Sequence, residues 1–174
     1  MNKFAITAGH SDTDPGAVAN GRKEAAIARE MRNLVAAKLR ERGCKVMTDG
    51  SGHENMPLTV AITLAKQANV AVEFHCNAST NPAASGVETI SLPKDKALSQ
   101  RISKAIADTL GARLRGEAGW IDQSKSARGR LGFVNAGGLI VELFFISNPA
   151  ELAAWDAKKW LVASAVADVL AGGQ

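Results

Sequence analysis

Short apolar runs alternate along the chain with segments whose apolar residues recur every three to four positions. The runs predict strands, and the periodic segments predict helices with one buried face. We expect strands over residues 4–7, 44–48, 69–75, 86–92 and 138–145, and helices over residues 23–42, 58–68, 95–110 and 149–171. Gly43 and Gly111 mark helix ends, and Asn148-Pro149 supplies an N-cap and a first-turn proline.

This alternation predicts a single layered α/β domain with a twisted, mostly parallel, mixed sheet flanked by helices. Turn-forming residues place loops at 8–16, 49–57 and 76–82, and residues 120–134 are expected to form a mobile loop with a short strand or turn. No repeat, linker or low-complexity tract divides the chain, so residues 1–174 are expected to form one domain.

Composition and charge exclude several classes of protein. With 46% hydrophobic and 22% charged residues, the chain has the composition of a globular protein rather than a disordered one. The longest apolar stretches, residues 139–146 and 162–171, are interrupted by Glu142 and Asp168 and are shorter than the ~20 residues of a membrane-spanning helix. No stable membrane insertion is therefore expected. The net charge of +4 is too small to indicate a nucleic-acid partner.

The N-terminal apolar run is too short for a signal peptide, which predicts synthesis in the cytoplasm. Cys44 and Cys76 have no C-x-x-C spacing and are expected to be buried free thiols.

Four ionisable residues stand out by their positions. His10 and His75 each follow or close a predicted strand, Glu24 lies in the first turn of a helix, and Glu142 interrupts an apolar strand. Each has an ordinary structural interpretation: a histidine held by hydrogen bonds, a carboxylate at a helix start, or a buried carboxylate paired with an arginine. If the two strands are neighbours, however, His10, Glu24 and His75 converge at the carboxyl edge of the sheet.

Two imidazoles and one carboxylate are the ligand set of a catalytic zinc ion, because they leave a fourth position open for water. We therefore predict one zinc ion per chain, bound by His10, Glu24 and His75. Glu142 is the predicted proton acceptor, since a carboxylate in an apolar strand is costly unless a cation or a functional cleft compensates it.

Several other polar residues receive weaker predictions. Asn77 shares a strand face with His75 and is a candidate for orienting a ligand or substrate. Glu73 shares the same face, and we expect it either at the surface or in a supporting role beside His75 rather than in a catalytic role. Cationic side chains between residues 120 and 134 are ordinarily solvated but are candidates for contacting substrate carboxylates: Lys125, Arg128 and Arg130. The remaining predictions are that His53 is solvated, that Asp12 and Asp14 form turns, that Trp155 and Trp160 pack in the core, and that Trp120 is a candidate substrate contact.

Read in order, the motifs resemble those of the zinc-dependent N-acetylmuramoyl-L-alanine amidases of the type-three amidase family, including small bacteriophage endolysins. The resemblance rests on ordered blocks that span most of the chain: Ala8-Gly9-His10 with Asp14-Pro15-Gly16-Ala17, Lys23-Glu24, Phe74-His75-Cys76-Asn77-Ala78 with Ser85-Gly86-Val87-Glu88, and Val141-Glu142 with Phe145-Ile146-Ser147-Asn148-Pro149. It implies the same four site residues, with Glu142 as the catalytic carboxylate that exchanges a proton with the attacking water and the departing amine.

The resemblance also implies a biological role. Such enzymes cut peptidoglycan between N-acetylmuramic acid and the L-alanine of the peptide stem. A single catalytic domain without a separate wall-binding domain resembles a monomeric phage lysin, which is made in the host cytoplasm and reaches the wall after another protein opens the membrane. Two alternatives stay open: a zinc peptidase that cuts within the stem, and a non-catalytic domain that binds the wall or nucleic acid through basic residues.

Overall fold

A six-stranded mixed sheet forms the centre of the molecule, in the strand order β4-β1-β5-β8-β6-β7. The computed structural model describes residues 2–127 and 129–172. The strands of this sheet are β1 (Lys3–Ala8), β4 (Lys45–Thr48), β5 (Val70–Asn77), β6 (Glu88–Ser91), β7 (Trp120–Asp122) and β8 (Gly138–Phe145). Neighbours from β4 to β8 run parallel, whereas β6 is antiparallel to β8 and parallel to β7. The prediction of a mostly parallel, mixed sheet is confirmed.

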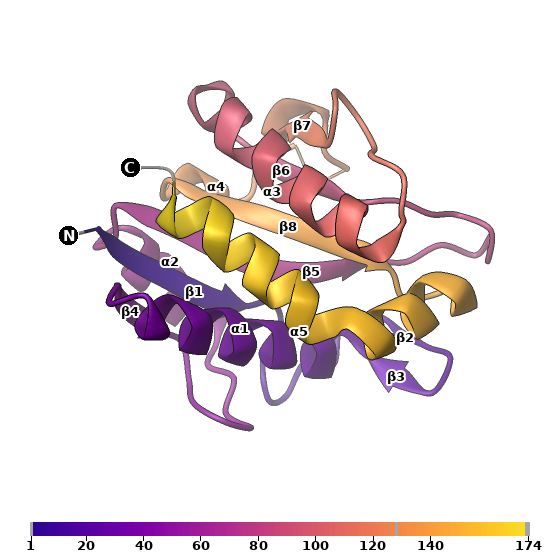
Figure 1. Cartoon of the computed structure of the whole chain (residues 1–174), viewed down its shortest axis with the longest axis horizontal. Helices are drawn as coiled ribbons and strands as arrows, with labels where there is room; N and C mark the ends of the chain where they lie inside the picture. Colours follow the sequence, from indigo (N-terminus) through magenta and orange to yellow (C-terminus); the bar gives the residue numbers. More distant parts are fainter. Residues whose placement is uncertain (1, 128, 173–174) are drawn as a thin grey trace.

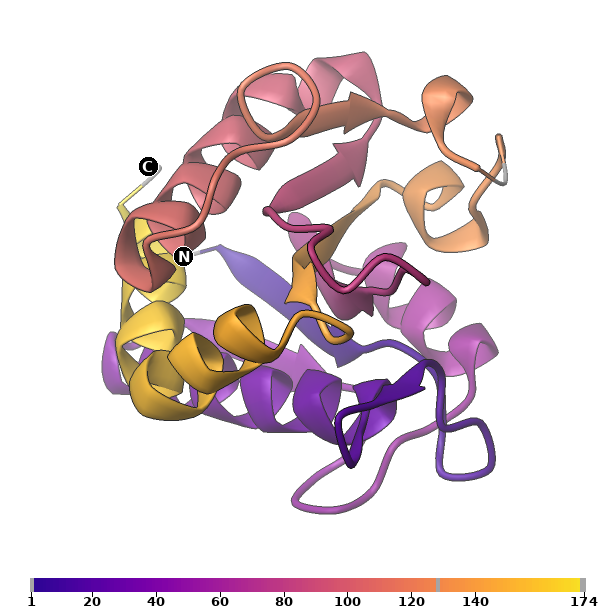
Figure 2. The same cartoon turned by 90° about the vertical axis from the view of Figure 1, so that its right-hand side faces the viewer.

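Helices cover both faces of this sheet. They are α1 (Glu24–Glu41), α2 (Leu58–Ala65), α3 (Lys96–Leu110), α4 (Gly132–Asn135) and α5 (Pro149–Ala171), with 3-10 turns η1 (Pro93–Asp95) and η2 (Gln123–Lys125). Helices α1, α3 and α5 lie in front of the sheet in Figure 1, and the view turned by 90° in Figure 2 places α2 and α4 on the other face.

Strand alternation divides the core between the two faces. Phe4, Ile6 and Phe74 point towards α1, α3 and α5, while Ala5 and Ala71 point towards α2 and α4. The small residues on the second face let α2 and α4 lie close to the sheet. The polar residues of β1, β5 and β8 continue this second face towards the carboxyl ends of the strands, where a site can form.

The predicted helix signals operate as expected. Ile27, Met31 and Val35 of α1 are fully buried, in keeping with their helical spacing. Gly111 ends α3 in the left-handed conformation at φ 74°. The side chain of Asn148 accepts hydrogen bonds from the backbone N–H groups of Ala150 and Glu151, which caps α5.

Several details differ from the sequence prediction. A two-stranded hairpin of β2 (Val18–Ala19) and β3 (Arg22–Lys23) precedes α1 where only loop and helix were expected. Residues 120–134 contain the short strand that was expected there, β7, which completes one edge of the sheet. They also contain η2 and most of α4, which were not predicted. Both cysteines are free as predicted, but Cys44 is only half-buried.

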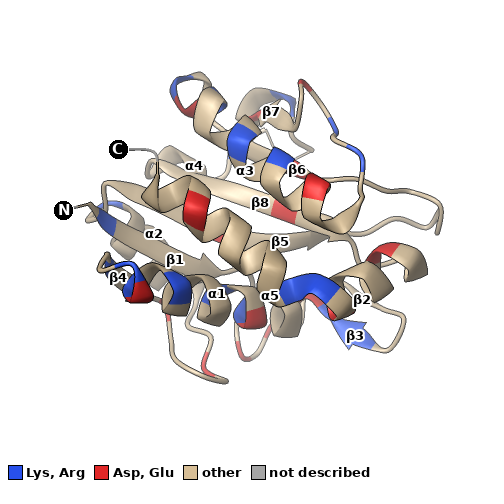
Figure 3. Ribbon diagram, viewed as in Figure 1, with Lys and Arg blue, Asp and Glu red and all other residues tan. Residues whose placement is uncertain are grey.

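Charged side chains of both signs lie on the outer surfaces of the helices. Lys and Arg alternate with Asp and Glu over the helices in Figure 3, as expected for solvated helix faces. Among the described residues, no helix is long and apolar enough to cross a membrane.

Candidate metal centre

The loop that leaves β1 carries His10 in a conformation rare for a residue with a side chain. Its φ is 69°, in the left-handed region, a type of backbone strain that is common at functional sites. The loop then returns through Gly16, at φ 64°, where an added Cβ would lie 2.5 Å from Nε2 of His10 and 2.7 Å from Oε2 of Glu24. Glycine at this position thus leaves room for the two side chains to meet.

Glu24 is the first residue of α1 and one of the few buried carboxylates of the chain, at 5% exposure. Its Oε2 accepts from the backbone N–H of Ala17, and its Oε1 accepts from the backbone N–H of Cys76. These two bonds join the hairpin segment before α1 to the end of β5, and they fix the carboxylate between them.

His75 lies near the end of β5, beside the end of β1. The neighbouring Gly9 has no side chain, and an added Cβ there would lie 2.1 Å from Cε1 of the His75 ring. Glycine is therefore required for the ring to occupy its position over the end of β1.

The three predicted ligands converge on one point. Nε2 of His10 lies 2.9 Å from Oε1 of Glu24, and Nδ1 of His75 lies 2.9 Å from the same oxygen. One ligand atom from each residue lies within 4.8 Å of the other two. Nε2 of His10 is buried and has no hydrogen-bond partner of suitable geometry among the described residues. Two imidazole nitrogens and one carboxylate oxygen, one of them unsatisfied, fit the donor set of a zinc site with an open position.

The far side of each imidazole is held by another carboxylate. Nδ1 of His10 lies 3.0 Å from Oδ2 of Asp14, and Nε2 of His75 lies 3.1 Å from Oε1 of the buried Glu73. A carboxylate that accepts the second N–H of a histidine fixes its tautomer and orientation, which leaves Nε2 of His10 and Nδ1 of His75 free to bind a metal ion. Of the two roles expected for Glu73, the surface position is wrong because the residue is 3% exposed, and its contact with His75 is consistent with the supporting role.

The same contacts set the protonation of the metal-free site. Burial opposes the ionised form of Glu24, but contacts with His10 and His75 outweigh it and hold the pKa of Glu24 well below its usual range. Burial likewise opposes the charged form of His75, yet Glu24 and Glu73 raise the pKa of His75 well above its usual value. The carboxylates thus favour a positive charge among the imidazoles, which a bound cation would supply in place of protons.

Glu142 of β8 lies beside this group. It pairs in register with His75 on β5, so both side chains project from the same face of the sheet. Its Oε2 is buried and has no hydrogen-bond partner in the described part of the chain. Burial raises the pKa of Glu142 to about 7, and the negative charges of Glu24 and Glu88 add to this effect. A carboxyl group in this state exchanges a proton readily near neutral pH.

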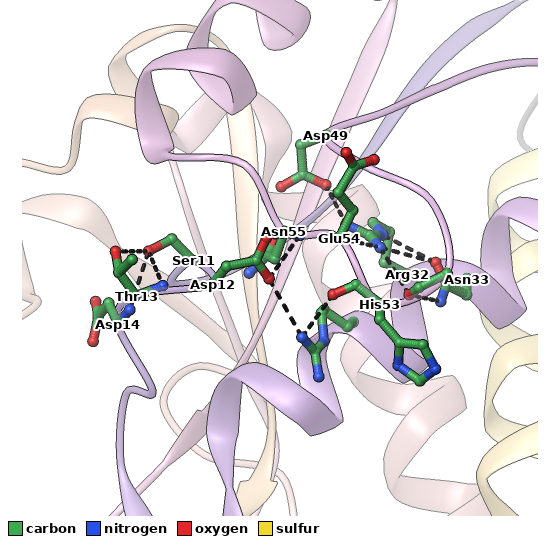
Figure 4. Close-up of polar contacts among 12 residues, drawn as sticks. Ser11, Asp12, Thr13, Asp14, Arg32, Asn33, Asp49, His53, Glu54 and Asn55 are labelled. Carbon is green, nitrogen blue, oxygen red and sulfur yellow. Dashed lines mark hydrogen bonds and ion pairs between the residues drawn. The ribbon is translucent and has the colours of Figure 1, made fainter.

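A polar network fastens the His10 loop to the loop between β4 and α2 (Figure 4). The carboxylate of Asp12 accepts from the backbone N–H of Asn55 and pairs with Arg29, so it bridges two loops rather than forming the predicted local turn. Deeper in the protein, fully buried Arg32 pairs with Asp49 at 3.1 Å. Asp49 also accepts from the backbone N–H of Ala8, two residues before His10.

The weaker sequence predictions have mixed outcomes. Asn77 donates to Oε1 of Glu88, a carboxylate that pairs in register with Glu142. Lys125 and Arg130 are exposed, Arg128 lies outside the described residues, and His53 is exposed as predicted. The prediction for Trp160 is wrong, because this side chain is 52% exposed whereas Trp155 is fully buried. Trp120 is 8% exposed and donates to Ser91, which makes it part of the core packing.

Sequence reasoning missed three residues near the site. Asp14 was assigned to a turn, and it does accept from the backbone N–H of Gly16, but its other oxygen contacts His10. Glu88 pairs in register with Glu142 across β6 and β8, and Arg115 donates to Glu88. Only the antiparallel addition of β6 to β8 brings Glu88 here, and no periodicity in the chain predicts that pairing.

Both the sequence and the fold of the chain are similar to those of known proteins. Residues 5–171 match the family model of N-acetylmuramoyl-L-alanine amidases of type three. A sequence comparison with curated proteins finds no significant match. Among solved structures, a candidate N-acetylmuramoyl-L-alanine amidase from Neisseria meningitidis is 44% identical, with a TM-score of 0.91 and coverage of 99% of this chain and 95% of that one.

Two more distant structures share the fold. The catalytic domain of the N-acetylmuramoyl-L-alanine amidase CwlV from Bacillus (Paenibacillus) polymyxa var. colistinus is 24% identical, with a TM-score of 0.85 and coverage of 99% and 98% of the two chains. The catalytic domain of the endolysin CD27L, which targets Clostridia difficile, is 18% identical, with a TM-score of 0.73 and coverage of 98% and 97%.

Proposed function

Since this chain belongs to the N-acetylmuramoyl-L-alanine amidase family, we propose that it is a zinc-dependent member that lyses bacterial cell walls. The reaction is hydrolysis of the amide between the lactyl group of N-acetylmuramic acid and the L-alanine of the peptidoglycan stem. The observation that carries the zinc dependence is the convergence of His10, Glu24 and His75 within 4.8 Å, beside the unpaired carboxylate oxygen of Glu142.

The ligand residues are suited to zinc because they combine a negatively charged carboxylate with two imidazoles held in fixed orientations. His10, Glu24 and His75 would hold the ion, with Asp14 and Glu73 fixing the imidazoles from behind. A bound zinc ion lowers the pKa of a water molecule at the open position and polarises a carbonyl group. Contacts with His10 and His75 hold the pKa of Glu24 well below its usual range, so its carboxylate is ionised near neutral pH, as binding of a metal ion requires.

Glu142 supplies the proton transfers of the hydrolysis. Its carboxylate accepts a proton from the attacking water while the water oxygen forms a bond to the amide carbon. The neutral carboxyl then gives the proton to the departing nitrogen, and the bond between that nitrogen and the carbonyl carbon breaks. Burial, which raises the pKa of Glu142 to about 7, makes both transfers accessible near neutral pH.

The lytic role extends the proposal from chemistry to biology. The similarity in fold to the catalytic domain of an endolysin and the resemblance of the motifs to phage lysins support it. In this role the chain is made in the host cytoplasm, acts as a monomer and reaches the wall once another protein has opened the membrane. Expression in a Gram-negative host tests this: lysis should require a co-expressed membrane-permeabilising protein, and lysis without one would contradict the proposed route.

The chemical proposal is tested on purified cell walls. The protein should release intact stem peptides that begin with L-alanine, lose this activity with a chelator and recover it with zinc. Glu142→Gln should keep the metal and lower turnover by about 10²–10⁴-fold. Release of stem fragments that leave L-alanine attached to the sugar would indicate the alternative, a zinc peptidase, and activity unaffected by metal removal would contradict zinc dependence.

A further inference from the structure

A row of polar side chains crosses three neighbouring strands at the site. His75 on β5 pairs in register with Glu142 on β8, and Glu142 pairs with Glu88 on β6. Paired residues project from the same face of a sheet, and adjacent strands lie about 4.8 Å apart. Glu88 therefore lies one strand beyond Glu142, on the side away from the metal ligands.

Glu88 is held at both carboxylate oxygens. Its Oε1 accepts from Nδ2 of Asn77 at 3.1 Å, and its Oε2 accepts from Nε of Arg115 at 2.6 Å. Its side chain is only 12% exposed. The carboxylate thus serves as a fixed anchor between β5 and the segment that follows α3, rather than as a free acid.

Arg115 lies at the end of this row. Its guanidinium is held in place, but not all of its N–H donors have an acceptor. The backbone N–H of Arg115 donates to Val87 beside β6, and the guanidinium carbon lies 4.9 Å from the ring centre of Phe145. Nη1 makes one long contact, 3.4 Å, to the carbonyl of Ser85, and Nη2 has no acceptor in the described ranges of the chain. The side chain is 32% exposed, so it is only partly covered by the protein and is accessible to a ligand.

The charges of the row favour an anionic ligand at this edge. Glu142 and Glu88 would repel a substrate carboxylate between the metal ligands and Arg115. The guanidinium instead offers Nη2 and the weakly engaged Nη1 in a planar arrangement that matches a carboxylate. One strand spacing and one hydrogen bond place the guanidinium about 8 Å from Glu142. Two extended residues span about 7 Å, so a group on the second stem residue reaches Arg115 when the scissile amide lies at Glu142.

We propose that Arg115 is a specificity-determining residue that binds the free carboxylate of the acidic residue next to L-alanine in the peptide stem. The inference rests on the proposed function and deepens it, because it names the stem form that the enzyme prefers. Glycan units at the cleaved bond carry no free carboxylate, so this assignment also places the stem, rather than the sugar, over β6.

The experiment compares two muramyl peptides that differ only in the second stem residue, which carries either a free α-carboxylate or its amide. Wild-type enzyme should prefer the carboxylate form by about tenfold to a hundredfold in kcat/KM, mainly through KM, as expected for hydrogen bonds to a charged group. Arg115→Met should bring this ratio close to one, and Arg115→Lys should restore part of it. Arg113→Met is the matched control, since Arg113 is exposed on the same segment and bonds Ser85, and it should leave the ratio unchanged.

A double variant distinguishes the loss of carboxylate binding by Arg115 from repulsion between Glu88 and Glu142. Arg115→Met leaves Glu88 without its cationic partner beside Glu142, which could slow both substrates, so the ratio is also measured in Glu88→Gln/Arg115→Met, where the local charge is balanced. A ratio near one in this variant supports the proposal. A wild-type ratio near one, or a ratio that survives loss of Arg115, would overturn it. The wild-type enzyme is also assayed on whole walls for release of stems that begin with L-alanine. If it cleaves neither muramyl peptide and releases no such stems from the walls, the result counts against the proposed function instead.

Discussion

Replacing Glu142 with glutamine should stabilise the metal-free protein at neutral pH even though it removes turnover. The carboxylate lies in an apolar strand, its Oε2 has no partner among the described residues, and burial raises its pKa from 4.5 to about 7. Between these two pH values the folded state binds a proton that the unfolded state has released. The free energy of unfolding of the wild type therefore falls as the pH rises from 4.5 to 7.

The size of the effect follows from the two pKa values. A difference from 4.5 to about 7 corresponds to roughly 3 kcal/mol at about 1.4 kcal/mol per pH unit, and partial exposure of the residue lowers this upper limit. Glutamine keeps the shape and carries no charge at any pH. We expect Glu142→Gln to match the wild type near pH 4.5 and to exceed it by about 1–3 kcal/mol at pH 8.

Urea denaturation with a chelator present, followed by tryptophan fluorescence between pH 4.5 and 8, measures this difference directly. Trp155 is fully buried against Phe144 of the same strand as Glu142 and reports on the core. Glu54→Gln, which removes an exposed carboxylate, is the control and should show no pH-dependent gain. If Glu142→Gln were less stable than the wild type at pH 8, or if its advantage did not grow with pH, the reasoning about the buried carboxylate would be refuted.

Three further substitutions test the support of the site and of the fold. Glu73→Gln should weaken zinc binding by about 10–100-fold in a chelator competition, because it removes the carboxylate acceptor behind His75; unchanged affinity would show that the contact does not orient the ring. Gly9→Ala should lower zinc affinity in the same assay, since the added Cβ overlaps the His75 ring. It should also lower the free energy of unfolding by about 1–3 kcal/mol. A variant with wild-type zinc affinity would contradict the close packing. Asn148→Ala should cost about 1 kcal/mol in urea denaturation without altering zinc binding, and a loss of zinc would mean that the cap does more than hold α5.

The fold was largely predictable because its elements are set by local patterns. Apolar runs, helical periodicity and end signals such as Gly111 and Asn148 placed the main strands and helices. The short hairpin β2–β3 was not predictable, since it depends on pairing between two dipeptides rather than on a local pattern, and the sequence did not show that β7 forms the edge of the sheet. The error for Trp160 was avoidable: five residues turn a helix by roughly 140° beyond one full turn, so Trp155 and Trp160 cannot share a face.

The site residues that lie at the ends of strands and at the start of a helix were predictable. His10 and His75 follow from strand ends and Glu24 from a helix start, and a parallel sheet brings such ends together. Glu142 was identified by its cost in an apolar strand. The residues that complete the site could not be predicted, because the role of Asp14 depends on the ring orientation of His10, and those of Glu88 and Arg115 depend on strand order.

Metal content of the purified protein tests the central claim most directly. The account predicts one zinc ion per chain in both the wild type and Glu142→Gln, and loss of the ion in His75→Ala while the fold persists. A wild-type protein that releases intact stems from cell walls without any bound metal, or a His75→Ala variant that keeps its zinc, would contradict the assignment of the site.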